Sequence, residues 1–250
     1  IQLLNKDNEL QRSKVKQARL IIILISIGGL LIVFFLIVVY KQFLAKQKAN
    51  LKLKAQNKLI KKQKEDITDS ITYASRIQSA LLTPKEIMDE LLKDYFILFL
   101  PKDIVSGDFY WVNEFDKKVI TVTADCTGHG VPGAFMSMLG VAFLNEIVNK
   151  LTNQLTDDTC LCAANILNML REKVVNSLHQ TGKSGEAQDG MDIALCVIDL
   201  KTNLVEYAGA KNPLWIVRKD VTEIEEIVAT SRPIGFYDDK VTYKTNRISF

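Results

Sequence analysis

The feature that most constrains this chain is an uncharged, apolar run of 21 residues from Leu20 to Tyr40. Ser26 is its only clearly polar side chain. At about 1.5 Å of rise per residue, a helix of this length spans about 30 Å, the thickness of a bilayer hydrocarbon core. Arg19 and Lys41 bracket the run. The sequence therefore predicts a transmembrane helix here, with a signal sequence or a buried core helix as the alternatives.

The charges that flank this run predict its orientation. Residues 41–64 carry nine lysines and no acidic residue, whereas residues 1–19 carry five basic and two acidic residues. Because cytoplasmic flanks are enriched in Lys and Arg, the bias places the C-terminal part of the chain in the cytoplasm. The lysines either contact anionic headgroups or form a solvated helix face.

Residues 41–83 contain no Gly or Pro, so we expect one long neck helix. Apolar side chains recur in it every seven residues, at Leu53, Ile60, Ile67, Ala74 and Leu81. The companion heptad positions are polar except for Ile77. This one-sided seam predicts a parallel homodimeric coiled coil, and the alternative is an amphipathic helix docked on its own domain.

A second helix start is predicted directly after the neck. Thr83 is expected as the N-cap, Pro84 in the first turn, and Glu86 as the acidic partner of a capping box. We therefore begin the next domain at residue 84 and expect it to cover 84–250.

The net charge of +3 hides a strong asymmetry. Residues 1–64 carry 14 Lys or Arg against 2 Asp or Glu, whereas residues 65–250 carry 18 against 27. A protein that reads nucleic acid needs a basic face to neutralise phosphates. The acidic body therefore argues against a nucleic-acid partner.

Strand-like and helix-like runs follow one another in the acidic body. Expected strands lie at 95–100, 109–112, 119–124, 193–200, 204–207 and 214–218, and expected helices at 132–150 and 160–178. The strands cluster before and after the helical pair instead of alternating with helices. This order predicts an α+β fold of antiparallel sheets covered by helices.

A glycine-rich turn at 124–134 connects an expected strand to an expected helix. Gly128, Gly130 and Gly133 match the spacing of a dinucleotide-binding fingerprint. That fingerprint requires a second parallel strand after the helix, and here another helix follows. A nucleotide site is therefore the weaker interpretation.

Two acidic residues lie at the ends of neighbouring expected strands. Asp125 ends the strand at 119–124, and Asp108 follows Gly107 and precedes the strand at 109–112. Two carboxylates beside glycines suit Mg²⁺ or Mn²⁺, which prefer oxygen ligands. Gly-Asp pairs are also ordinary turn formers, so the spacing alone leaves a metal site and a simple turn both open.

Three stretches, 101–111, 124–134 and 189–195, resemble the SpoIIE-like branch of the metal-dependent (PPM) serine/threonine phosphatases, which includes bacterial sigma-factor regulators. Two further segments, 74–82 and 208–214, resemble the entry helix and a later strand–turn of such domains. The resemblance implies two antiparallel sheets packed face to face between helices, with a two-metal site at one end.

The resemblance also implies roles for particular residues. Asp108 would be the first metal ligand, Asp125 would bridge both metals, and Cys126 would offer its backbone carbonyl. The ions, Mn²⁺ or Mg²⁺, would activate a water that attacks phosphorus in line. Lys102 is a candidate for holding the phosphate, the alternative being a surface lysine.

Other residues near these motifs remain ambiguous. Asp189 and Asp192 either lie near the site or are turn and edge-strand acids. Related eukaryotic enzymes use a histidine two residues after the bridging acid, whereas His129 lies four after Asp125, so we do not carry that role over.

The family supplies further metal-binding aspartates after the region matching 247–250. We therefore expect this chain to be a fragment with little or no activity by itself.

Together these features predict a membrane-anchored receptor phosphatase of the bacterial cytoplasmic membrane, with 1–19 as the juxtamembrane end of an extracytoplasmic sensor. The resemblance implies that its substrate is a phosphoserine or phosphothreonine on a regulatory protein, such as an anti-sigma-factor antagonist. Repacking of the helix at 67–82 would move Asp108 relative to Asp125 and so regulate the site. The alternatives are a degenerate phosphatase domain that acts as a membrane-bound scaffold and, less favoured, a nucleotide-binding protein.

Overall fold

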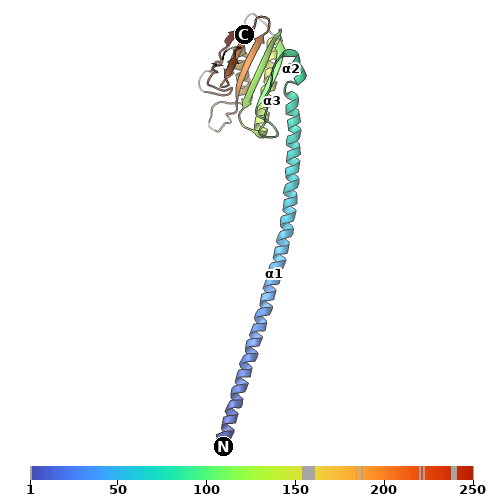
Figure 1. Ribbon diagram of the computed structural model, residues 1–250, viewed down its shortest axis with the longest axis vertical. Helices are drawn as coiled ribbons and strands as arrows, with labels where there is room; N and C mark the ends of the chain where they lie inside the picture. The colour runs from blue at the N-terminus through green and yellow to red at the C-terminus, as the bar shows by residue number, and fades with distance from the viewer. Residues whose placement is uncertain are drawn as a thin grey trace. The chain divides into compact units, whose positions relative to one another are not determined.

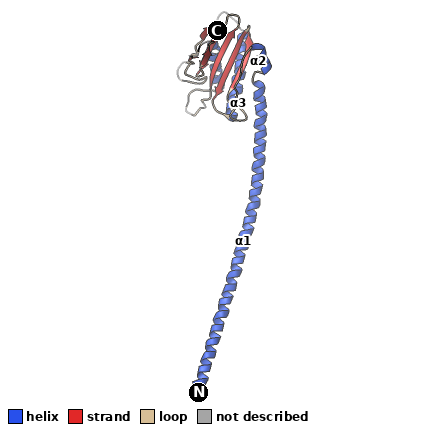
Figure 2. Cartoon of the chain, viewed as in Figure 1, coloured by secondary structure: helices blue, strands red, loops and turns tan. Residues whose placement is uncertain are grey.

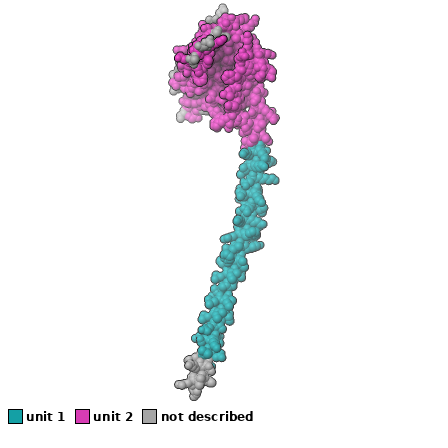
Figure 3. Space-filling model, in the orientation of Figure 1, with its two compact units in different colours: residues 1–66 teal, residues 67–250 magenta. Residues whose placement is uncertain are grey.

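The computed structural model describes residues 2–153, 161–183, 185–186, 188–219, 221, 223–237 and 241–249. The chain divides into two compact units, residues 1–66 and residues 67–250, which Figure 3 shows in different colours. The helix α1 (Gln2–Leu81) runs through the first unit and supplies the first element of the second.

Within its described residues, 2–66, the first unit consists of helix alone, drawn in blue to cyan in Figure 1. Residues 41–81 are helical throughout, as the absence of Gly and Pro predicts. Most apolar side chains between residues 20 and 40 are exposed, and Leu24 and Leu30 are 67% and 71% exposed. This stretch is long and apolar enough to cross a membrane. Helix α3 (Gly130–Asn153) passes the same test, but half of its apolar stretch is buried inside the second unit.

The second unit is built on antiparallel sheets, drawn as red arrows in Figure 2. The larger sheet has the strand order β1-β2-β3-β4-β7. Its strands are β1 (Phe109–Phe115), β2 (Lys118–Cys126), β3 (Met191–Asp199), β4 (Leu204–Ala210) and β7 (Asn246–Ser249). The strands β5 (Leu214–Val217) and β6 (Ile224–Ile227) form a second, two-stranded sheet. The predicted α+β class with antiparallel sheets flanked by helices is confirmed.

One face of the larger sheet carries the main hydrophobic core. Side chains alternate along each strand, and this face presents buried residues such as Trp111, Ile120 and Leu195. Helices α3 and α4 (Ala163–Ser177) cover it and bury residues such as Leu144 and Leu170 completely. Full burial of one such side chain contributes about 1.5–3 kcal/mol.

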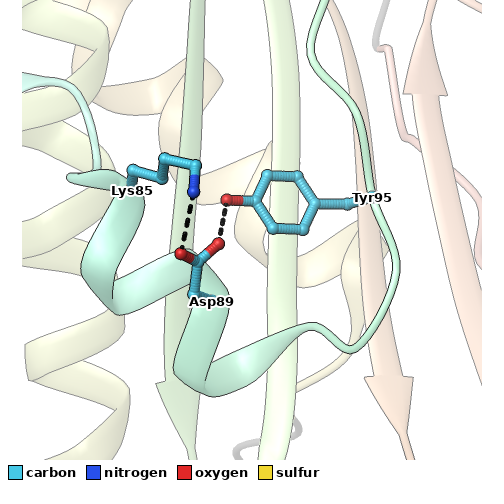
Figure 4. Close-up of polar contacts among 3 residues, drawn as sticks. All are labelled: Lys85, Asp89 and Tyr95. Carbon is cyan, nitrogen blue, oxygen red and sulfur yellow. Dashed lines mark hydrogen bonds and ion pairs between the residues drawn. The ribbon is translucent and has the colours of Figure 1, made fainter.

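The opposite face of the sheet holds a smaller cluster. Met88 of α2 (Lys85–Leu91) packs with Val112 and Val119 of β1 and β2. Beside it, Asp89 accepts hydrogen bonds from Lys85 Nζ at 3.0 Å and from Tyr95 Oη at 2.7 Å (Figure 4). These contacts fasten the segment that follows α2.

The predicted strand at 95–100 is wrong. The segment has no regular secondary structure, and Phe96 and Leu98 are 91% and 78% exposed. No strand among the described residues pairs with it. A run of β-forming residues becomes a strand only when a neighbour supplies the hydrogen bonds of a ladder.

The predicted N-cap at Thr83 is also wrong. Pro84 occupies the cap position of α2, and no side chain caps the helix. Thr83 Oγ1 instead accepts a hydrogen bond from Val112 N at 2.8 Å and donates one to Val112 O at 3.1 Å. Because β1 is an edge strand, its outward N–H and C=O groups need such a partner.

Candidate functional site

The strand register places three acidic residues in a row across one end of the larger sheet. Asp125 and Asp192 are direct partners in the β2–β3 ladder. Phe109 pairs with Ala124, so Asp108, one residue before β1, lies next to Asp125. The alternating neighbours of these acids point into the α3/α4 core. The three carboxylates therefore share the opposite face of the sheet.

The carboxylates perturb one another. Partial burial, the hydrogen bond that protonated Asp108 donates to the Asp125 carboxylate and the negative charge of Asp125 together raise the pKa of Asp108. Partial burial also raises the pKa of Asp192, although the Lys211 ammonium, 3.9 Å away, opposes this shift. Like charges at this spacing favour a bound proton or a bound cation between them.

Glycines let the two loops of the site approach each other closely. A Cβ atom at Gly107 would lie 2.8 Å from Gly128 O and 3.2 Å from Cys126 O. A Cβ atom at Gly133 would lie 2.6 Å from Gly128 O. The distances of 2.8 and 2.6 Å are too short for a real Cβ atom, so the loop before Asp108 packs backbone to backbone on the turn after Asp125.

Two hollows meet at Asp108 and Asp125. The smaller, about 100 Å³, is also lined by Lys102 and the turn at 128–130. The other, about 310 Å³, is also lined by the segment at 97–100. A larger hollow of about 570 Å³ lies beside α2 and includes neither acid. The carboxylate pair thus lies where small ligands can reach it from two sides.

The structure brings most of the predicted site residues together. Lys102 shares the smaller hollow with Asp108 and Asp125, and Asp192 extends their row. The Cys126 side chain points the other way, into the core, where burial raises the pKa of its thiol. Asp189 lines neither hollow, and its carbonyl accepts a hydrogen bond from Gln180.

The side chains at this site suit a hydrated cation better than a closed cage. Within the described ranges, no group of three His, Cys, Asp or Glu side chains could hold a metal. The available ligands are the carboxylates of Asp108 and Asp125 and the nearby carbonyl of Cys126. Mg²⁺ is commonly held by one or two carboxylates and completes its shell with water and phosphate oxygens.

One residue near the site was not predicted from the sequence. Gln78 of α1 is buried; its Nε2 donates to Ser106 O at 2.6 Å, and its Oε1 accepts from Ser106 N at 3.0 Å. Ser106 Oγ in turn accepts a hydrogen bond from Asp108 N at 3.0 Å. The end of α1 is therefore connected to Asp108 through one residue. No local pattern reveals this, because Gln78 and Ser106 are 28 positions apart.

The dinucleotide interpretation does not fit this topology. That fingerprint requires a strand, a helix and a second strand parallel to the first. Here the strand after the helices, β3, pairs with β2 in the antiparallel sense.

Comparison with known families identifies the fold. The family model for stage II sporulation protein E (SpoIIE) matches residues 116–250, more than half of the chain. The chain belongs to the SpoIIE family. It resembles the SiaA-PP2C domain of Pseudomonas aeruginosa with 30% identity and a TM-score of 0.61, over 74% of this chain and 68% of that one. The predicted family is therefore confirmed.

Other solved structures share less with this SpoIIE-family chain. The phosphatase domain and a regulatory fragment of SpoIIE from Bacillus subtilis match with 19% identity and a TM-score of 0.44, over 58% of this chain and 38% of that one. RsbX, solved in complex with magnesium, matches with 16% identity and a TM-score of 0.38, over 58% and 61%. No curated protein sequence matches the chain. The second unit is a PP2C-type phosphatase domain by family and by fold.

Proposed function

We propose that this SpoIIE-family protein hydrolyses phosphoserine or phosphothreonine on a regulatory protein in a metal-dependent reaction. The observation that carries the proposal is the meeting of Asp108 and Asp125 on one face of the sheet, in a hollow shared with Lys102. Carboxylates and a lysine in one small hollow suit a substrate that brings a divalent cation and a phosphate together.

The residues present fit Mn²⁺ or Mg²⁺. Asp108, Asp125 and the carbonyl of Cys126 would hold the cation, and the glycine contacts keep these groups close. When bound, the cation would offset charge on the phosphoryl group and make water a better nucleophile.

The chain also offers groups for the phosphate itself. Lys102 lines the hollow as a compact positive charge. Gly130, the first residue of α3, lines the same hollow, and the first turn of this helix has no acidic residue. The backbone N–H groups and dipole at a helix N-terminus favour anions. The phosphate would therefore be held both by the charge of Lys102 and by the N-terminus of α3.

The apolar stretch of α1 supports anchoring in the bacterial cytoplasmic membrane, with the phosphatase domain in the cytoplasm. The heptad seam supports a homodimer through the neck helix. The contact from Gln78 to Ser106 supports regulation, because displacement of the last turns of α1 would pull on the backbone two residues before Asp108. The substrate in this role is a phosphorylated antagonist of an anti-sigma factor.

Metal-dependent turnover of a phosphoserine peptide by the full-length protein tests the proposal. Asp125→Asn should lower kcat by about 10³-fold, because several kcal/mol of charge stabilisation are lost. Calorimetry should show weakened Mn²⁺ binding in the same variant. Asp94→Asn, an acid outside both carboxylate hollows, is the matched control. Full activity of Asp125→Asn would refute the proposal.

A binding scaffold is the second candidate function. It is favoured because, among the residues that the structure describes, no three acidic, histidine or cysteine side chains are placed to hold a metal ion together. Such a degenerate domain would bind its partner without binding Mn²⁺ tightly. Calorimetric titration of the full-length protein with Mn²⁺ therefore separates the two functions.

A further inference from the structure

His129 occupies an unusual position beside the carboxylate pair. It stands between Gly128 and Gly130, whose φ angles are +87° and +62°, in the turn from β2 into α3. L-residues with side chains rarely adopt such angles, so the two glycines allow a sharp turn that presents the residue between them. His129 lines the smaller hollow together with Asp108, Asp125 and Lys102.

Asp103 orients this histidine. The two side chains come from different loops, and His129 Nδ1 lies 3.0 Å from Asp103 Oδ2. A carboxylate at Nδ1 fixes the ring orientation and holds a proton on that nitrogen. Among the contacts of the described residues, the hydrogen bond to Asp103 is made by Nδ1. The other ring nitrogen, Nε2, is therefore the one that can contact a ligand. The side chains of His129 and Asp103 are 70% and 44% exposed, so a protein substrate can reach the pair.

In related eukaryotic enzymes a histidine lies two residues after the bridging acid. The residue at that position in this chain cannot act as a general acid. Two residues after Asp125 stands Thr127. Its N–H donates to Gly190 O at 2.9 Å, and its Oγ1 accepts from Gly190 N at 3.1 Å. Thr127 therefore fastens the ends of β2 and β3, and the turn that follows it carries the imidazole.

We propose that His129 is the general acid of the proposed phosphatase reaction and that Asp103 is its positioning residue; this inference rests on the proposed function. The oxygen of a water forms a bond to phosphorus while the bond from phosphorus to the serine oxygen breaks. His129 Nε2 gives its proton to that serine oxygen. The attacking water releases a proton to solvent, from which the ring is reprotonated. The balance is phosphoserine and water giving serine and phosphate.

This role predicts a dependence on the leaving group. A serine alkoxide is strongly basic and leaves readily only when it is protonated, whereas a nitrophenolate is a weak base and needs little help. General acid catalysis typically contributes about 10²–10⁴-fold. Loss of the acid should therefore slow a phosphoserine peptide far more than it slows p-nitrophenyl phosphate.

The test compares both substrates in the full-length protein with Mn²⁺. We expect His129→Ala to lower the ratio of kcat for the phosphoserine peptide to kcat for p-nitrophenyl phosphate by about 10²-fold. Asp103→Asn should lower the same ratio by about tenfold, because the ring stays but is held less firmly. His179→Ala is the matched control, since this exposed histidine lies outside both carboxylate hollows.

Two outcomes would overturn the inference. One is an unchanged ratio in His129→Ala, whether both rates fall together or neither falls. The other is weaker Mn²⁺ binding by calorimetry in His129→Ala, because the histidine would then act through the metal site. If the wild-type protein hydrolyses neither substrate, the proposed function itself fails, which is a different result from either of these.

Discussion

The two units use the same residue types under opposite conditions. In the first unit, side chains such as Leu31 and Leu51 are 63% and 64% exposed, and the described residues 2–66 form part of one helix. In residues 67–250, Leu144 and Leu170 are completely buried between helices and sheet. A residue in the first unit therefore affects stability through its helix propensity and its contact with solvent. A buried residue in the second unit affects stability through packing against its neighbours. Matched substitutions in the two units test this difference.

The largest contrast is expected for leucine. Leu144→Ala should lower the free energy of unfolding of the second unit by about 2–5 kcal/mol, because it removes transfer energy and leaves a cavity. Leu51→Ala should change that free energy by less than about 0.5 kcal/mol. Urea denaturation followed by tryptophan fluorescence measures both, since both tryptophans lie in the second unit. Equal losses would contradict the comparison.

Glycine should show effects of different size and sign. Gly133→Ala places a Cβ atom 2.6 Å from Gly128 O and should cost about 1–3 kcal/mol. Gly29→Ala meets no atom within 4 Å and should be neutral or slightly stabilising, because alanine favours helix. Thermal unfolding and helicity by circular dichroism measure the two effects. A stable Gly133→Ala protein with intact Mn²⁺ binding would show that the close loop contact is not needed.

Glutamine on α1 offers a third matched pair. Gln78→Ala leaves Ser106 N without its side-chain partner and removes one of the two side-chain donors to Ser106 O, and it should cost about 1–2 kcal/mol. It should also weaken Mn²⁺ binding, because Ser106 holds the backbone of Asp108. Gln63→Ala, on an exposed part of the same helix, should change neither quantity. An unaltered Mn²⁺ affinity in Gln78→Ala would show that the contact between α1 and Ser106 does not affect the site.

The smallest contrast concerns two exposed lysine–acid pairs spaced four residues apart. Lys61–Glu65 in the first unit is 3.8 Å long and has no tertiary support, so Lys61→Met should leave stability unchanged. At Asp89, the hydrogen bond from Tyr95 lowers the pKa of the carboxyl group most, and the hydrogen bond from Lys85 lowers it further. Tyr95→Phe should therefore raise the pKa of Asp89 toward its ordinary value, as measured by NMR titration.

The sign of the pH dependence follows from that shift. Because the pKa of Asp89 is lower in the folded protein than in the unfolded chain, the contact stabilises the fold above the unfolded pKa. The stabilisation is lost as the pH falls through the folded pKa. The stability difference between wild type and Tyr95→Phe should thus close at acidic pH, and a constant difference would contradict the role of Asp89.

Local patterns predicted most of the secondary structure. The β-branched run at 119–124 lies within β2, and the expected helix at 132–150 lies within α3. The expected helix at 160–178 contains α4, although its first residue, Cys160, lies outside the described residues. The prediction failed at 95–100 because a strand depends on a partner, and no pattern within six residues tells whether one exists.

The candidate site was predictable only in part. Asp108 and Asp125 stood out because Asp125 ends an expected strand, Asp108 directly precedes one, and glycines lie close to both in the sequence. Their alignment with Asp192 depends on the register of β3 against β2, and a slip of one residue would turn Asp192 to the other face. The contact between Asp103 and His129 joins two loops and has no signature in either.

The amino-acid order by itself determined the apolar helix, the basic neck, the acidic body and the glycines that bracket the carboxylates, because these depend on composition and on periods of two to seven residues. Only the tertiary structure decided which side chains meet. Asp108 reaches Asp125 through strand register, and Gln78 and His129 reach their partners through loop packing. Those meetings depend on the free energy of the whole domain, because distant segments approach each other only when the core that joins them is formed.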